Sequence, residues 1–498
     1  MDFWQSMALG FAVLAEPANI LFCFAGVLLG TLVGVLPGLG PAATIALLLP
    51  VTFRLGPTPS IIMIAGIYYG AKYGGSTTSI LMNIPGEADS VVTCIDGHKM
   101  ARAGRAGSAL GIAAFGFFIA GTLGTVGLML LAPMLAKFAL RFGPPEIFAL
   151  MMLALTLLIY LASGSPIKAL LMAALGIFLG TIGMDIFTGK QKFTLGIVTL
   201  YDGLGIVPVI MGLFGVAEVL ENIEKGIKRE IYKTQVKNLF PTLKDWKESI
   251  GAIFRGTILG FFVGILPGGG GIISTLVSYG VEKRLSKHPE QFGQGAIAGV
   301  AGPESANNAT SGSNFIPLMT LGIPCNSVMA IILAALLLHG LRPGPLLIKE
   351  NPSLFWGVLA SMYVGNVILL LLNWPLISLW VRLLKVPYAI LLPLILFFCL
   401  LGSYTLNNNF VEVLIMIIFG VIGYMMRKLE FEPAPLVLAY VLSPLIEGSL
   451  LRSLLMSQGN PVIFFSRPIA CTVLIMAVIL LLTSTLRKTP LFKGSLED

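Results

Sequence analysis

The stretch that decides the fold is GFFVGILPGGGG, residues 260–271, in which an apolar segment reaches Pro267 and continues into four glycines. Two polar runs follow, GPESANNATSGSN at residues 302–314 and LGIPC at residues 321–325, and apolar sequence encloses both. Non-helical backbone persists at membrane depth only where protein buries it or where it lines a wet cavity. The stretch from Gly260 to Ser327 therefore predicts broken helices inside a membrane and a candidate binding site.

The same design occurs near the start of the chain. Residues 27–40 pair without a gap with residues 257–270, and eight of the fourteen positions are identical. Further along, the layout of Gly70–Ser79 matches that of Gly302–Ser311. The motif NIPG at residues 83–86 then matches GIPC at residues 322–325 after a short insertion. The chain is therefore expected to contain two copies of one unit, each with a break near its start.

Composition predicts a polytopic membrane protein. Of the 498 residues, 56% are hydrophobic and 11% are charged, whereas roughly 25% of the residues in an ordinary soluble protein are charged. The formal net charge is +8, but the Lys and Arg residues lie in short loops between apolar runs. There they act as topology determinants, so no nucleic-acid partner is expected. The five cysteines are scattered without ligand spacing, which implies neither a disulfide framework nor a metal site.

The apolar runs predict an all-α fold with about twelve transmembrane helices. The runs Pro41–Phe53 and Ile61–Tyr69 are about half a bilayer long, as expected for the arms of a broken or re-entrant hairpin. The segment Asp96–Arg105 is basic and is expected to be a cytoplasmic loop. Other spans are expected near residues 17–36, 108–133, 146–163, 166–187, 354–381, 386–402, 410–426, 434–447 and 469–486, with a weaker segment at 193–220.

The charge pattern divides the chain into four parts, which are a first repeat half at 1–217, a polar cytoplasmic linker at 218–250, a second repeat half at 251–447 and a C-terminal span and tail at 448–498. A linker is preferred over a docking site because loops first of all join elements. Basic residues follow the glycine break in the second copy but the NIPG motif in the first, and this reversal favours inverted repeats. After the glycine break, the second copy has Lys283, Arg284 and Lys287 where the first has Arg54. After the NIPG motif, the first copy has Lys99, Arg102 and Arg105 where the second has Arg342 and Lys349.

An interrupted helix presents free N–H groups at one end and free carbonyls at the other, with partial charges of opposite sign. N–H groups beside Ser, Thr and Asn suit a carboxylate, whereas carbonyls and hydroxyls suit a small cation. The alternative is that these small residues only let helices pack closely. The predicted substrate-binding residues are Pro37, Gly38, Gly40, Lys72, Gly74, Gly75, Ser76, Thr77, Thr78, Ser79, Asn83, Pro267, Gly268, Gly269, Gly270, Asn307, Asn308, Thr310 and Ser311.

Ion coupling is assigned to the same region of the sequence, at Gly74, Thr78, Asn308, Thr310 and Glu304. Proton coupling needs a titratable group inside the membrane, and Glu87, Asp89 and Glu304 are the carboxylates near the breaks. Hydroxyls, amides and carbonyls are more numerous there and suit a hard cation, which favours Na⁺ over H⁺.

Lys72 has two interpretations. It is either a counter-charge for a substrate carboxylate or a snorkelling or ion-paired lysine at a helix end.

Several long motifs resemble the large membrane subunit, TctA, of the tripartite tricarboxylate transporters. They are YGGSTTSIL at 73–81, DGHKMARAGRAG at 96–107, YDGLGIVPVIMGLFG at 201–215, GILPGGGG at 264–271, EKRLSKHPEQFGQGAI at 282–297, AGPESANNA at 301–309 and LGIP at 321–324. The similarity extends over roughly residues 20–440. One departure is Cys325, where the family pattern leads us to expect glycine.

This resemblance implies a secondary carrier in a bacterial inner membrane. Its partners would be a small membrane subunit (TctB-like) and a periplasmic solute-binding protein (TctC-like). Its substrates would be organic carboxylates, chiefly di- and tricarboxylates such as citrate, taken up by means of an ion gradient and without a bound cofactor. Alternating access is expected, and analogy with inverted-repeat anion carriers favours an elevator over a rocking bundle.

The alternative from another class is an intramembrane enzyme acting on a lipid or a small anion. Such enzymes gather His, Asp, Glu or Cys into one constellation, whereas His98, His288 and His339 lie in or beside separate predicted loops. A scaffold that only anchors a partner would not require duplicated breaks. The sequence therefore predicts a transporter rather than an enzyme, and it leaves the carboxylate, the stoichiometry and the oligomeric state open.

Overall fold

The computed structural model describes residues 3–36, 40–161, 165–185, 189–225, 239–266, 270–377, 379–380 and 388–486. The first part of the chain contains α1 (Phe3–Leu14), α2 (Pro17–Val35), α3 (Pro41–Phe53), α4 (Pro57–Met82), η1 (Ala88–Ser90), α5 (Val91–Met100), η2 (Ala101–Arg105), α6 (Ala106–Ala139), α7 (Pro144–Leu161) and α8 (Pro166–Gly180). Next come β1 (Gly183–Met184), β2 (Gln191–Lys192), η3 (Val198–Leu200), α9 (Ile206–Ile210), η4 (Met211–Val216) and α10 (Ala217–Lys225).

The second part begins with α11 (Leu243–Ile265), α12 (Gly271–Leu285), η5 (Pro289–Gln291), α13 (Ala298–Ser313), α14 (Phe315–Leu321), α15 (Ser327–Leu338), α16 (Leu347–Glu350) and α17 (Pro352–Asn373). It ends with α19 (Tyr388–Asn407), α20 (Phe410–Lys428), α21 (Pro433–Met456), α22 (Ile463–Ser466) and α23 (Pro468–Leu486). Many of these helices begin with proline, whose fixed φ and missing N–H suit the first helical position.

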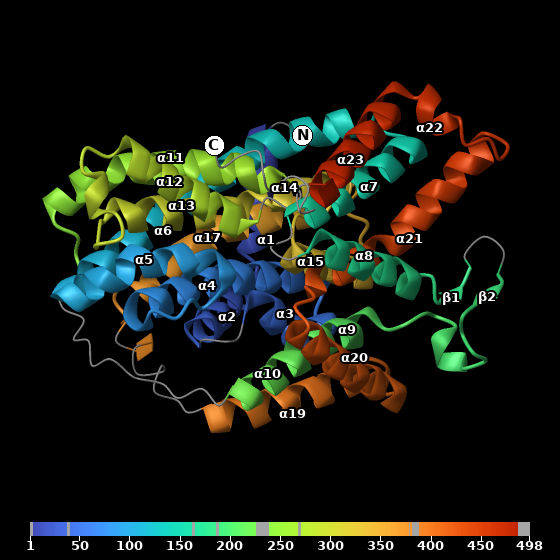
Figure 1. Cartoon of the computed structure of the whole chain (residues 1–498), viewed down its shortest axis with the longest axis horizontal. Coiled ribbons are helices and arrows are strands. Elements are labelled where there is room, and N and C mark those ends of the chain that lie inside the picture. The colour runs from blue at the N-terminus through green and yellow to red at the C-terminus, as the bar shows by residue number, and fades with distance from the viewer. Residues whose placement is uncertain are drawn as a thin grey trace.

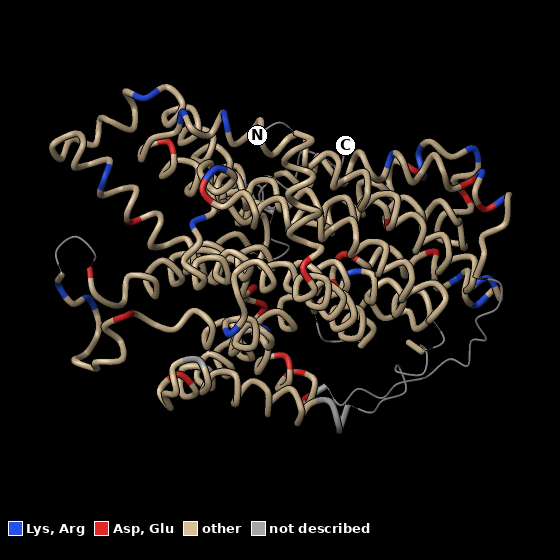
Figure 2. The backbone as a smooth tube through the Cα atoms, turned by 180° about the vertical axis from the view of Figure 1, so that it is seen from behind, with Lys and Arg blue, Asp and Glu red and all other residues tan. Residues whose placement is uncertain are grey.

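The fold is helical and polytopic. Within the described residues the strands are β1 and β2, a short antiparallel pair in which Gly183 faces Lys192. By length and composition, seven helical segments of the described chain can cross a membrane. Shorter apolar helices, such as Pro41–Phe53 and Pro166–Gly180, accompany them. Figure 2 shows many of the Lys and Arg residues toward the edges of the molecule and some within its outline.

The helices form a central bundle with two smaller groups beside it (Figure 1). In the bundle, α2, α4 and α5 lie on one side and α11, α12 and α13 on the other, and α6 and α17 join the two sides. One smaller group consists of α7, α8, α21 and α23, and the other consists of α9, η4, α10, α19 and α20. The helix α3 contacts both the bundle and the second of these groups.

The predicted helix interruptions are present. Helix α2 ends at Val35 and α3 begins at Pro41, and between them Leu36 and Gly40 have extended backbone angles. Helix α11 ends at Ile265 and α12 begins at Gly271. The predicted site residues Pro37, Gly38, Pro267, Gly268 and Gly269 lie outside the described residues.

Glycines bring α2 onto α4 and α11 onto α13 at the same spacing. On α2, a Cβ added to any of three glycines would lie 2.1–2.4 Å from a carbonyl oxygen of α4, so no larger residue fits there. These contacts join Gly26 to Met63, Gly30 to Ile67 and Gly34 to Ala71. On the other side Gly256 meets the Gly302 carbonyl and Gly260 the Ala306 carbonyl, and an added Cβ at Gly264 would lie 2.9 Å from the Thr310 Cα. Because backbones approach this closely only over glycine, the two matched segments pack in the same way.

This packing corrects the register that the sequence predicts for α4 and α13. The contacted residues are 239 positions apart in every case, as from Met63 to Gly302. The left-handed residues that end the helices, Asn83 (φ 56°) and Gly322 (φ 71°), have the same separation. The predicted pairing of Gly70 with Gly302 is thus seven positions, or about two helical turns, away from the packing register. In the packing register the short insertion is not needed.

The prediction of non-helical backbone was wrong for the polar run at residues 302–314 and for its counterpart at residues 70–79, whereas LGIPC leaves the helix after Leu321 as predicted. Residues 70–79 lie inside α4 and residues 302–313 lie inside α13, and Ile61–Tyr69 belongs to the same 26-residue α4 rather than to a separate arm. The reason is that their hydroxyls bond to carbonyls one turn back, as in Ser79 to Gly75 and Ser311 to Asn307. Polar side chains that are satisfied in this way remain compatible with a helix.

Three other boundaries also differ from the prediction. The segment Asp96–Arg105 is helical in α5 and η2 rather than a loop, and Gly104, with φ 79°, makes the bend there. The predicted 166–187 span is too long, because α8 stops at Gly180, before the β1–β2 pair. In the weaker 193–220 segment, the transmembrane candidate begins at Ile206. Local glycine and turn chemistry decides these ends more than apolar content does.

Candidate functional site

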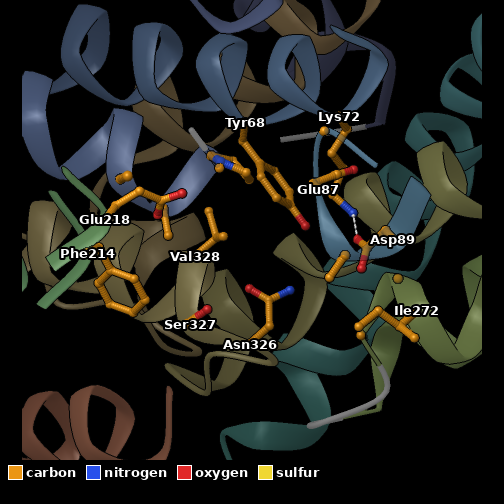
Figure 3. A pocket seen from close by; sticks show the side chains of 18 of the residues that line it. Tyr68, Lys72, Glu87, Asp89, Phe214, Glu218, Ile272, Asn326, Ser327 and Val328 are labelled. Atoms are coloured by element: carbon orange, nitrogen blue, oxygen red, sulfur yellow. Dashed lines mark hydrogen bonds and ion pairs between the residues drawn. The ribbon is translucent and has the colours of Figure 1, made fainter. Parts of the chain in front are cut away.

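A cavity of about 450 Å³ lies where the two helix interruptions approach each other (Figure 3). Its wall combines segments that are far apart in the sequence, namely the starts of α3, α12 and α15, the η1 turn, the middle of α4 and one face of η4 and α10. The lining residues are Gly40, Pro41, Ala42, Ala43, Tyr68, Lys72, Gly86, Glu87, Ala88, Asp89, Phe214, Glu218, Gly270, Gly271, Ile272, Ile273, Asn326, Ser327 and Val328.

Three helix N-termini open onto this cavity. Helices α3 and α12 start after the extended residues Gly40 and Gly270, and α15 starts at Asn326, whose side chain accepts a hydrogen bond from the Met329 amide at 2.9 Å. The first N–H groups of a helix have no acceptor within that helix and carry partial positive charge. The convergence of three such ends favours binding of an anion.

A buried ion pair forms one wall of the cavity. Lys72 is 2% exposed, and its Nζ lies 2.5 Å from Asp89 Oδ2. The same Nζ donates to Asn307 Oδ1 at 2.9 Å, and Asn307 Nδ2 donates to Glu87 Oε1 at 3.3 Å. The network thus joins α4 and the η1 turn to α13, which lies on the other side of the central bundle. Lys72 lies well inside the 26-residue α4, so it is an ion-paired lysine and not a snorkelling one at a helix end.

The opposite wall comes from η4 and α10. Figure 3 shows Phe214 and Glu218 across the cavity from Lys72 and Asp89. The Glu218 carboxylate is balanced by Arg427 of α20, whose Nη2 lies 3.2 Å from Glu218 Oε2. The cavity therefore lies between the central bundle and the group of helices that contains α10 and α20.

Glu304 lies close to this network but does not line the cavity. It is fully buried in α13, and its carboxylate accepts hydrogen bonds from Ser76 Oγ at 2.6 Å and from Thr93 Oγ1. Its two hydrogen-bond donors come from α4 and α5, so this carboxylate connects α13 to both of these helices. No Lys or Arg forms an ion pair with it within the described residues.

Of the predicted substrate-binding residues, Gly40, Gly270 and Lys72 line the cavity, and Asn307 contacts Lys72. Others support the helix packing around it. Asn308 donates to Asn366 Oδ1 of α17 at 3.3 Å, and Thr310 donates to the Gly260 carbonyl of α11 at 2.9 Å. The remaining predicted residues of α4 and α13, which do not line the cavity, are Gly74, Gly75, Ser76, Thr77, Thr78, Ser79 and Ser311, and Asn83 ends α4.

Sequence reasoning missed Tyr68, Glu218, Phe214 and Asn326. Tyr68 belongs to an apolar run, and Phe214 and Glu218 are distant from both breaks in the sequence. The sequence did contain a pattern that could have identified Asn326 as a site residue. Asn326 directly follows the GIPC motif, as Glu87 follows NIPG.

Cys325, the residue where glycine was expected, is accommodated without strain. It is buried, and its Sγ lies 3.9 Å from the carbonyl oxygen of Ile265, the last residue of α11. Its counterpart Gly86 has no such room, because an added Cβ would lie 2.4 Å from the Gly75 Cα. The positive φ in this motif belongs to Gly322 and not to Cys325.

Within the described part of the chain, no three His, Cys, Asp or Glu residues are grouped so as to hold a metal ion. All five cysteines are free.

Comparison with known proteins identifies the family. The model described as the tripartite tricarboxylate transporter TctA family matches residues 20–438. An uncharacterized 52.8 kDa protein in the TAR-I ttuC' 3' region of Agrobacterium vitis is 52% identical over 474 residues, which cover 95% of this chain and 94% of that protein.

A second uncharacterized protein of Agrobacterium vitis, from the TAR-II ttuC' 3' region, is 49% identical over 231 residues, which cover 46% of this chain and 96% of that protein. No solved structure matches. With its helical polytopic fold, its anion-favouring cavity and a family match over most of its length, the chain belongs to the TctA family of tripartite tricarboxylate transporters and is a membrane transporter component rather than an enzyme.

Proposed function

We propose that this chain is the large subunit of a binding-protein-dependent carrier that takes up a small di- or tricarboxylate such as citrate across the bacterial inner membrane. Its partners are a small TctB-like membrane subunit and a periplasmic TctC-like binding protein, in keeping with the family. The observation that carries the proposal is the convergence of the α3, α12 and α15 N-termini on one cavity beside Lys72.

The cavity has the chemistry that a carboxylate needs. First-turn N–H groups of three helices offer hydrogen bonds to its oxygens, and the volume of about 450 Å³ is of the size of small-molecule sites. Lys72 and Asp89 neutralise each other in the buried ion pair. A bound carboxylate then shares Lys72 with Asp89, and Asn307 keeps the ammonium group in place.

Coupling to Na⁺ is the second part of the proposal. The C-terminal ends of α2 and α11 carry partial negative charge at the same interruptions where α3 and α12 offer positive ends. Thr78 Oγ1 bonds to the carbonyl of Val35, the last residue of α2, at 2.9 Å. We assign the cation to this side of the breaks, with oxygens of Gly74, Thr78, Asn308, Thr310 and Glu304 as candidate ligands. Hydroxyl, carbonyl and carboxylate oxygens suit a hard cation.

The topology that we propose is about twelve spans in two inverted repeats. Support comes from the shared glycine spacing of α2 on α4 and α11 on α13, and from the reversed distribution of basic residues in the sequence. Movement of the bundle against the group containing α10 and α20, as an elevator, would expose the cavity to each side in turn. The walls of the cavity belong to these two bodies.

The test is uptake in membrane vesicles from cells that co-express the chain with its two partner proteins. Radiolabelled citrate, tricarballylate, malate and succinate are supplied under an inward Na⁺ gradient, an equal choline gradient or a proton gradient. Accumulation of at least one of these acids that requires both the Na⁺ gradient and the binding protein is expected. Accumulation under the proton gradient alone would overturn the coupling assignment, and no accumulation of any acid would overturn the proposed substrate class.

A variant pair tests the site. Asn307→Ala combined with Asn308→Ala is expected to abolish uptake while the protein still inserts into the membrane. The matched control is Asn373→Ala, which changes another buried asparagine whose Nδ2 bonds only one turn back along α17 to the Leu369 carbonyl. Normal uptake by the double variant would remove α13 from the site.

A further inference from the structure

Tyr68 is the aromatic residue of α4 that faces the cavity. It is 1% exposed and lines the cavity one helical turn before Lys72. Figure 3 shows its hydroxyl directed into the space between Asn326 and the Glu87–Asp89 turn. Lys72 Nζ lies 5.1 Å from the centre of its ring. At this distance the ammonium group is within range of a cation–π interaction with the ring.

Two amide groups from the second copy approach the Tyr68 oxygen. Asn314, fully buried between α13 and α14, donates from Nδ2 at 2.9 Å. Asn326, the N-cap residue of α15, places its side-chain amide next to the same hydroxyl. A phenolic oxygen accepts such bonds and has one proton to donate. In the described part of the chain, that proton has no acceptor.

We propose that the Tyr68 hydroxyl donates a hydrogen bond to a carboxylate oxygen of the transported anion, and that Asn314 and Asn326 hold it in this donor role. The inference rests on the proposed function, since it names a recognition group of that same cavity. Tyr68 is neutral, so it can select an oxygen acceptor without changing the charge balance that Lys72 and Asp89 set. Asn314 acts through Tyr68 and is therefore a positioning residue.

The arrangement also depends on contact between the two proposed copies. Tyr68 comes from the first copy, and both amides come from the second. A hydroxyl directed in this way exists only while α4, α13 and α15 are together. Recognition by Tyr68 therefore requires the assembled cavity and not either helix break alone.

The experiment compares Tyr68→Phe with Tyr73→Phe in the vesicle assay with both partners present. Tyr73 is a matched control, because it is also buried in α4, but its hydroxyl bonds to the Leu110 carbonyl at 3.3 Å and does not line the cavity. The probe is citrate, or the acid of the tested panel that the wild type accumulates. Loss of a hydrogen bond to a charged group predicts that Tyr68→Phe raises the KM by about ten- to a hundredfold, whereas Tyr73→Phe changes it less than about twofold.

The positioning role has its own readout. Asn314→Ala alone is expected to raise the KM, but in the Tyr68→Phe background it is expected to add nothing, because the hydroxyl it orients is absent. Additive losses would overturn the positioning role, and a KM of Tyr68→Phe equal to that of the wild type would overturn the inference. Thermal unfolding of each variant in detergent identifies a fold defect. If the wild type accumulates none of the acids, the proposed function fails instead.

Discussion

Replacing Lys72 by methionine tests the charge balance of the cavity. Lys72 is 2% exposed and Asp89 is 16% exposed, and their charged atoms lie 2.5 Å apart. Methionine removes the cation, so Asp89 and the neighbouring Glu87 lose the ammonium group that offsets their charge. Removing one member of a buried pair costs about 3–5 kcal/mol. At about 1.4 kcal/mol per factor of ten, the unfolding equilibrium shifts roughly a hundred- to several-thousandfold.

The assay is thermal unfolding of the purified variant in detergent. The measured quantity is the fraction of protein that stays monodisperse after heating. Adding Asp89→Asn to Lys72→Met is expected to restore most of the lost stability, because the uncompensated charge is then removed. The matched control is Lys168→Met. Lys168 is 35% exposed, lies 3.9 Å from a well-exposed Glu430 and donates to the Leu429 carbonyl at 2.7 Å. Because water can replace these exposed contacts, its loss is expected to cost about 1 kcal/mol or less.

Equal stability of Lys72→Met and the wild type would refute this reasoning, and so would a double variant no more stable than the single one. Uptake by the stable double variant separates the two roles of Lys72. Restored uptake means that the lysine only compensates Asp89. A stable protein without uptake means that the ammonium group also binds the substrate.

Three further predictions concern the scaffold. Gly260→Ala is expected to destabilise the protein by about 1–3 kcal/mol, because its Cβ would lie 2.2 Å from the Ala306 carbonyl oxygen, whereas Gly280→Ala, with nothing within 4 Å, should be neutral or slightly stabilising in the same unfolding assay. Asp96→Ala leaves the amides of Gly293, Gly295 and Ala296 and the Tyr279 hydroxyl without their carboxylate acceptor. It should cost at least about 1–3 kcal/mol and make residues 286–297 sensitive to protease, and unchanged cleavage would show that this anchor is dispensable. Cys325→Gly empties a small buried site beside Ile265 and should lower stability by about 1 kcal/mol with uptake retained; lost uptake would show that the thiol side chain has a role in transport.

Much of the architecture follows from local pattern. The extended residues before Pro41 and Gly271, the glycine spacing on α2 and α11 and the low charge content are all readable without a fold, because proline, glycine and charge act on the backbone and on its partition into lipid. The helical state of the polar runs was not predictable in this way. Ser79 and Ser311 are compatible with a helix because surrounding protein buries them and a carbonyl four residues back accepts their protons.

The sequence by itself determined that the chain crosses a membrane several times, that its helices break at two matched places and that it resembles the TctA family. Tertiary structure alone decided which residues share the cavity. Tyr68 and Asn326 come from distant parts of the chain, Glu218 lies far from either break in the sequence, and Lys72 is paired with Asp89 rather than left free. Sequence periodicity shows which residues share one face of a helix or strand. A binding site depends instead on which distant side chains the packing of backbones brings within hydrogen-bond distance.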